Sequence, residues 1–335
     1  MSGSLFLRTD FSAQQTKEFR RDRLGRIVQN AVTTTSVDTV SLDRDVFNGI
    51  DPTTSERLDS WSVTNQRHSG RCWEFAGLNV IRAQVMRNLN IDNLEFSQNH
   101  IAFFDKIEKV NFAFARAVET IDLPDGDEQV RELLGELSDG GYWPQFVDIV
   151  GKYGLVPQWA MPDTESSGNT DRMNRALEKI VRRVVGQIRA ARDADDRDTR
   201  IAAAREQGLK DAWRVLAIHL GTPPTSFTWQ YRDKDKNFHR EGTFTPTQFA
   251  RHIIPGDLGE YVTVQHDPRT ENPVGQGYVR EHTPYMVGRP GYSYVSAEMD
   301  DIKALAIESI RAGEPVWFSC DVNAQFDREL GIWDA

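Results

Sequence analysis

The segment NQRHSGRCWEFAG, residues Asn65–Gly77, joins a polar loop to the start of a regularly spaced apolar stretch. After Cys72 the apolar positions recur at intervals of three and four residues, at Phe75, Leu78, Ile81, Val85 and Leu89. That spacing is typical of a helix with one buried stripe. The sequence therefore predicts a helix that begins at Cys72, with a polar loop directly before it.

A cysteine at the start of a helix can act as a nucleophile, although a lone cysteine is more often a small buried hydrophobic residue. The free backbone N–H groups and the dipole of the helix favour the thiolate, which is the reactive form. Gln66, in the loop before Cys72, can donate its side-chain amide to an oxyanion together with the Cys72 backbone N–H. Trp73 is predicted to brace the helix start against the opposite wall of a cleft.

The remaining pattern predicts an N-terminal arm, then helices up to about residue 220, then mixed helix and strand. The arm covers residues 1 to about 60 and contains one short helix, Thr16–Asn30. The further predicted helices are Ser97–Val118, Val130–Leu137, a hairpin over 172–220, a capped helix from Thr245 and Pro246, and Ser296–Arg311 with Ile302, Leu305 and Ile310 inward. The predicted strands are Phe227–Tyr231 and a buried strand at Val316–Cys320.

Composition excludes several classes of protein. Of 335 residues, 27% are charged and 39% hydrophobic, which is the composition of an ordinary globular chain and not of a collagen-like or disordered one. No apolar run reaches the roughly 18 residues of a membrane span, so no membrane partner is expected. The net charge of −10 makes nucleic acid a poor partner. Two cysteines without nearby metal-like ligands disfavour a disulfide framework and zinc, and they indicate a cytoplasmic protein.

The dense charge of ARDADDRDTR, residues 191–200, is predicted to mark a solvated turn between the two arms of the helical hairpin. A metal site would also explain so many carboxylates. Nothing in the segment closes a coordination shell, so the turn is preferred.

The segment Asn65–Gly77 resembles the active-site segment of papain-like cysteine peptidases, specifically the bleomycin hydrolase and aminopeptidase C family. Other stretches are similar to the same family, and the likeness runs from about residue 20 to the last residue. These stretches are LEFSQNHIAFFDKIEKVN, ETIDLPDGD, DGGYWPQFVDIVGKYGLVP, WQYRDKDKNFHR, TPTQF and AGEPVWFSCDV. The resemblance implies an α+β, papain-like fold with a helical insertion and a second, β-rich domain that is incomplete in this chain.

The resemblance also implies a division into domains and roles for single residues. It implies an arm at 1–60, a helical papain-like domain with the nucleophile at 61–170, a helical hairpin insertion at 171–255, and the start of the β-rich domain at 256–335. Gln66 and Cys72 match the family's oxyanion donor and nucleophile. Gly140 and Gly141 resemble the backbone that pairs with an extended substrate, although a structural turn would explain them almost as well. A homohexamer whose active sites face an internal channel is implied, and no cofactor or metal is.

A papain-like site also needs a histidine as general base and an asparagine that orients it. In the family these residues lie beyond the strand that resembles PVWFSCDV, and no histidine follows His282 here. We therefore expect the base to lie beyond Ala335. Spacing alone would nominate His219, but it belongs to a helix of the insertion. His282 is little better than His219 as a candidate, and His68 lies on the loop of Cys72, where it could tune the thiol but hardly replace the base. Cys320 is predicted to serve packing.

Two functions follow from these observations. The first is a thiol aminopeptidase that resembles bleomycin hydrolase and releases N-terminal residues from peptides through Cys72. The second is an inactive subunit with a structural or peptide-binding role, which the missing base favours for this polypeptide taken alone. Exopeptidase rather than endopeptidase action rests on the resemblance.

Overall fold

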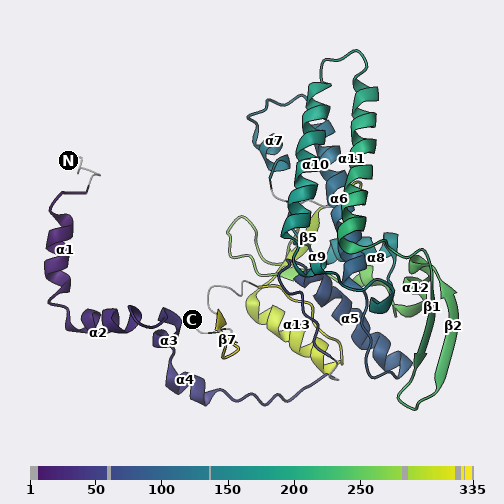
Figure 1. Ribbon diagram of the computed structural model, residues 1–335. Helices are drawn as coiled ribbons and strands as arrows, with labels where there is room; N and C mark the ends of the chain where they lie inside the picture. The colour runs from purple at the N-terminus through teal and green to yellow at the C-terminus, as the bar shows by residue number, and fades with distance from the viewer. Residues whose placement is uncertain are drawn as a thin grey trace. The chain divides into compact units, whose positions relative to one another are not determined.

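The computed structural model describes residues 7–58, 62–135, 137–280, 286–320, 326–327 and 329–333 (Figure 1). The chain forms two compact units. One consists of the terminal segments, Met1–Ser55 and Ser319–Ala335, and the other is Glu56–Phe318. The larger unit contains Cys72 and all the other residues predicted for the site. The domain boundaries near residues 170 and 255 stay predictions.

The terminal unit holds short helices without a core of their own. None of their residues is buried. The prediction of a single helix over Thr16–Asn30 is wrong, because one helix ends at Phe19 and another begins at Arg23. Asp22 caps the second helix by accepting a hydrogen bond from the Gly25 N–H. The elements are α1 (Phe11–Phe19), α2 (Arg23–Val32), α3 (Val37–Ser41), α4 (Arg44–Gly49) and the antiparallel pair β6 (Phe326–Asp327) and β7 (Ile332–Trp333).

Helices make up the first part of the larger unit, and the predicted helix at Cys72 is confirmed as α5. Asn90 ends α5 in the left-handed conformation, and the Ser97 hydroxyl caps α6 by accepting from the His100 N–H. The helices are α5 (Cys72–Leu89), α6 (Gln98–Glu119), α7 (Glu128–Leu133), α8 (Trp143–Tyr153), α9 (Glu165–Gly168), α10 (Asp171–Ala190) and α11 (Arg197–Leu220), with a 3-10 turn at Gln158–Ala160.

The predicted helical hairpin is confirmed as α10 and α11, which pack against α6 in Figure 1. Leu177, Val184 and Leu216 are fully buried among them. Residues 191–196 of the charged segment form the turn between the two helices, as predicted, whereas Arg197–Arg200 already belong to α11.

Short strands follow the hairpin. β1 (Phe227–Arg232) pairs with β2 (Phe238–Phe244) in an antiparallel ribbon, and β3 (Val264–Gln265), β5 (Tyr292–Ser296) and β4 (Gly277–Arg280) form a small mixed sheet in that order. The predicted capping box is confirmed at the start of α12 (Pro246–Ile253), where Thr245 and Gln248 bond reciprocally. A 3-10 turn at Leu258–Glu260 and the helix α13 (Met299–Arg311) complete the unit.

Three sequence predictions need correction here. Val316–Cys320 is irregular and mostly exposed, not a buried strand, because an apolar segment becomes a strand only where a neighbour supplies ladder hydrogen bonds, and no described residue does so. Leu305 is 51% exposed, so α13 does not bury it. No helix was predicted between Leu137 and residue 172, yet α8 begins at Trp143, with Pro144 in the first turn.

Candidate active site

Cys72 is exposed at the first position of α5, between neighbours that are buried. Arg71 and Trp73 on either side are 2% and 3% exposed, and Glu74 is 1% exposed. The first intrahelical bonds begin at the Glu74 and Phe75 N–H groups, which both donate to the Arg71 carbonyl. Among the described residues, the Cys72 N–H has no acceptor, and its thiol has no partner. The helix start therefore presents a free thiol beside a free backbone donor.

The loop before Cys72 is closed by its own hydrogen bonds. Asn65 Oδ1 accepts from the Arg67 N–H at 2.8 Å, which supports a positive φ of 56° at Arg67. The Ser69 hydroxyl donates to the Gln66 carbonyl at 2.7 Å. The Gln66 side chain is half-buried, and its Oε1 is buried without a partner among the described residues. The loop thus carries Gln66 six residues before Cys72, and its side-chain oxygen has no partner among the described residues.

The segment 137–141 packs directly against the start of α5. The Trp73 indole Nε1 donates to the Asp139 carbonyl at 2.8 Å. A Cβ on Gly141 would lie 2.5 Å from the Trp73 ring, so only glycine allows the backbone to approach the indole this closely.

Gly140 and Gly141 are not equivalent. The Gly140 N–H donates to the Ser138 hydroxyl, and its carbonyl accepts from Lys109 Nζ at 2.7 Å. The Gly141 N–H and carbonyl make no hydrogen bond with any described residue. Of the two predicted substrate-binding glycines, Gly141 therefore offers free backbone groups.

Buried charges lie beneath the helix start. Burial raises the pKa of Glu74 well above its ordinary value, and the nearby carboxyls of Asp105 and Asp139 act in the same direction. Burial also works against ionisation of Asp139, but Lys106 and the Thr170 hydroxyl hold the pKa of Asp139 below its ordinary value. Asp139 is therefore ionised in the folded protein, and the proton of Glu74 is retained to higher pH.

Comparison with known proteins agrees with this geometry. The chain matches the Peptidase C1-like family over residues 6–335. It is 33% identical to aminopeptidase C of Lactobacillus delbrueckii subsp. lactis, across 92% of this chain and 69% of that protein. It is 37% identical to bleomycin hydrolase of Rattus norvegicus, across 81% of this chain and 61% of that protein. A crystal structure of PepW from Lactobacillus rhamnosis aligns with a TM-score of 0.92 at 33% identity, across 97% of this chain and 73% of that chain.

The chain belongs to the Peptidase C1-like family.

The predicted fold, α+β and papain-like, is thus confirmed, as is the predicted class of enzyme, a cysteine aminopeptidase. Such peptidases act on peptides. The chain spans less than the full length of each of these relatives, between 61% and 73% of it. No helix among the described residues is long and apolar enough to cross a membrane, and none of the described residues form a cluster that could hold a metal ion.

No histidine in the described part of the chain forms a hydrogen bond with the Cys72 thiol. His219, in the last turn of α11, shares a 2.7 Å hydrogen bond with the Ser166 hydroxyl. His68 is exposed, and its backbone N–H donates to the Gly168 carbonyl. His282 lies outside the described residues. Cys320 was predicted to serve packing, but it is exposed, because the segment that carries it is not a strand.

The sequence analysis missed the buried charged residues near the start of α5. Asp105, Lys106 and Lys109 of α6 are all buried and lie near Asp139. Charges on a helix ordinarily mark its solvated face, so composition pointed the other way. The signal that could have revealed them is their position in the sequence. They lie between the apolar residues of Ser97–Val118, which are predicted to be buried.

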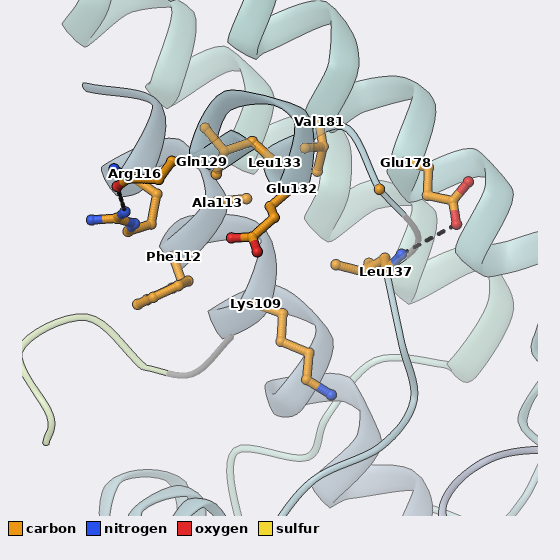
Figure 2. A pocket seen from close by; sticks show the side chains of 11 residues that line it. Lys109, Phe112, Ala113, Arg116, Gln129, Glu132, Leu133, Leu137, Glu178 and Val181 are labelled. Carbon is orange, nitrogen blue, oxygen red and sulfur yellow. Dashed lines mark hydrogen bonds between the residues drawn. The ribbon is translucent and has the colours of Figure 1, made fainter. Parts of the chain in front are cut away.

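A pocket separate from Cys72 lies between α6, α7 and α10 (Figure 2). Lys109 and Leu137 line it, and Glu178 of α10 accepts from the Leu137 N–H at 3.2 Å. The pocket thus borders the segment that leads to Asp139, and Glu178 anchors the start of that segment.

Proposed function

We propose that Cys72 is the nucleophile with which this chain cleaves the first peptide bond of peptide substrates. One observation carries the proposal: the exposed thiol stands at a helix start whose flanking side chains are buried, next to a free backbone N–H. A fixed donor and an accessible thiol at one point are what acyl transfer to sulfur requires.

The thiolate attacks the carbonyl carbon of the first residue, and the carbonyl oxygen becomes an oxyanion. The Cys72 N–H and the Gln66 side-chain amide donate hydrogen bonds to it. The position of the half-buried Gln66 side chain in the loop directly before Cys72 supports this role. Collapse of the intermediate releases the amine and leaves an acyl thioester, which water then hydrolyses.

Proton transfer to the leaving amine needs a general base and acid, and this role is assigned to no histidine of residues 1–335. His219 is bonded to Ser166 in the α9–α11 region.

Gly141 is proposed to bind the substrate backbone through its free N–H and carbonyl. Trp73 is 3% exposed, so it acts indirectly: its buried ring packs against Gly141 and fixes the position of that backbone. Gly140 is held by Ser138 and Lys109, so its part is to fix the conformation of Gly141.

A peptide-guided alkylating reagent tests this function. A dipeptidyl chloromethyl ketone should alkylate Cys72 and leave Cys320 unmodified, as judged by peptide mapping. Both thiols are exposed, so access does not distinguish them, and a preference for Cys72 greater than that shown by iodoacetamide would report recognition of the peptide. Equal labelling of the two, or labelling of neither, would overturn the proposal.

The second candidate is a catalytically inactive, peptide-binding subunit, which the lack of a matching base in residues 1–335 favours. Measured binding of a dipeptide without its hydrolysis would favour this second function.

We further propose a cytoplasmic homohexamer, on family resemblance alone. A molar mass of about six chains by light scattering would support that assembly, and a monomer would contradict it.

A further inference from the structure

We infer that Asp139 is a positioning residue that ties the Cys72 loop to the Gly140–Gly141 segment, with Lys106 and Lys109 as its buried support. The inference rests on the proposed function, since the two segments need a fixed separation only if Cys72 acts on a peptide bound at Gly141.

Asp139 contacts the nucleophile's surroundings on both sides of Cys72. Its Oδ2 accepts from the Gly70 N–H at 3.0 Å, two residues before the thiol. Its backbone carbonyl accepts from the Trp73 indole at 2.8 Å, one residue after it. A Cβ on Gly70 would lie 2.8 Å from the Asp139 Cβ, so the loop can approach this closely only with glycine there. Asp139 also directly precedes Gly140, so it contacts the Cys72 loop and is itself part of the segment that contains Gly140 and Gly141.

Two buried lysines hold the other side of the segment. Lys106 Nζ lies 2.5 Å from Asp139 Oδ1 and 3.0 Å from the Ser138 carbonyl. Lys109 Nζ donates to the Ser138 and Gly140 carbonyls at 3.0 and 2.7 Å, and it lies 2.8 Å from Asp105 Oδ2. Three successive residues before Gly141 are therefore fixed from α6.

The charges of this network balance in pairs, Asp139 with Lys106 and Asp105 with Lys109. Each of the four side chains is at most 9% exposed. Removing one member of such a pair leaves an uncompensated buried charge, which is costly. The network therefore has one favourable arrangement, and that arrangement sets the distance between α5 and the substrate segment.

Asp139 acts through other residues and not on the substrate. Both carboxylate oxygens already accept two donors each. Oδ1 accepts from Lys106 and Asn174, and Oδ2 accepts from the Gly70 N–H and the Thr170 hydroxyl at 2.5 Å. No position on the carboxylate is left for a reacting proton, so a role as catalytic base is not available to it.

The test compares two alkylation rates at Cys72 in the full 335-residue chain. Iodoacetamide needs only an accessible thiol, whereas a dipeptidyl chloromethyl ketone also needs a correctly placed substrate segment. In Asp139→Asn the ratio of the guided to the unguided rate should fall by about tenfold, the size expected for loss of a hydrogen bond to a charged group. A purely structural role would change both rates alike and leave the ratio unchanged, which would overturn the inference.

Asp267→Asn is the matched control. Asp267 is also buried and multiply bonded, to Arg269, Asn272 and Tyr294, but it has no bond to either active-site segment. This variant should lose stability and keep the ratio of the native chain; a ratio lowered as much as in Asp139→Asn would overturn the inference.

If Asp139→Asn does not fold, Thr170→Val removes one hydrogen bond from Asp139 and should lower the ratio by about threefold. An unchanged ratio in a folded Thr170→Val protein would then count against Asp139. If the native chain shows no guided labelling at all, the proposed function fails and the inference falls with it. Guided labelling in the native chain with an unchanged ratio in the variant defeats the inference alone.

Discussion

At the scale of single residues, the proposed chemistry depends on two hydrogen-bond donors beside the Cys72 thiol. The Cys72 N–H is free because it is the first residue of α5, and Gln66 is held by bonds within its own loop. The backbone donor cannot be removed by substitution, so Gln66 is the donor that mutation can test.

Gln66→Ala should lower kcat of the active peptidase by about 10² to 10³, the usual loss for one oxyanion donor. The rate is measured with an aminoacyl fluorogenic substrate, in a form that includes the general base. Gln129→Ala is the control, because Gln129 is a glutamine on α7, away from the thiol, whose side chain accepts from Arg116. A Gln66 variant with an unchanged rate would remove this residue from the site.

At the scale of elements, periodicity predicted most of the helices and little of what lies between them. The stripe from Phe75 to Leu89 is enough to define α5, and Thr245 with Gln248 is enough to start α12. The strands β3 to β5 are only two to five residues long, and their pairing depends on distant segments, so no local pattern could reveal them.

The candidate site divides in the same way. Cys72 and Gln66 could be proposed because a local motif carries them, but the motif says nothing of Asp139 or of the buried lysines of α6. Those residues acquire their roles only when α6, the 137–141 segment and α5 come together, and a single sequence does not contain that information.

The packing of α6 against α8 predicts how the free energy of unfolding depends on pH. His100 of α6 is buried, its Nε2 lies 3.2 Å from the Tyr153 carbonyl at the end of α8, and burial lowers its pKa to about 4. The unfolded chain takes up this proton near pH 6.5, whereas the folded chain does so only near pH 4. The free energy of unfolding is therefore highest above pH 6.5 and should fall by up to about 3 kcal/mol between pH 6.5 and 4 from this group.

His100→Gln should remove this loss of stability. The free energies of unfolding measured with urea at pH 7 and pH 5 should then differ by less than in the native chain. The variant will be less stable at pH 7, because it disturbs a packed site. His68→Gln, at an exposed position, serves as the control and should keep the native difference. A His100 variant with the full native loss on acidification would show that another group causes it.

At the scale of the whole molecule, the larger unit leaves apolar side chains exposed near its C-terminal end. Leu305 and Ile307 of α13 are 51% and 50% exposed, and Phe318 is 73% exposed. Surfaces of this kind favour association. The exposed groups are side chains of a helix and of an irregular segment, so association does not need a strand edge.

We predict that the 335-residue polypeptide alone has negligible aminopeptidase activity and associates in solution. The first expectation follows from the lack of a matching histidine, and the second from the exposed apolar side chains, so the two can fail separately. Light scattering and an aminoacyl fluorogenic assay check them. A monodisperse monomer would contradict the second, and turnover by the chain alone would return attention to His68, His219 and His282.

The most direct test of the central claim is the relative reactivity of the two cysteines. Both are exposed, so access does not distinguish them, but only Cys72 stands at a helix start with Arg71 before it. Limited treatment of the folded chain with iodoacetamide near pH 6, followed by peptide mapping, should modify Cys72 about tenfold faster than Cys320. Cys72→Ala should leave only the slow reaction. Equal labelling of Cys72 and Cys320 would contradict the account.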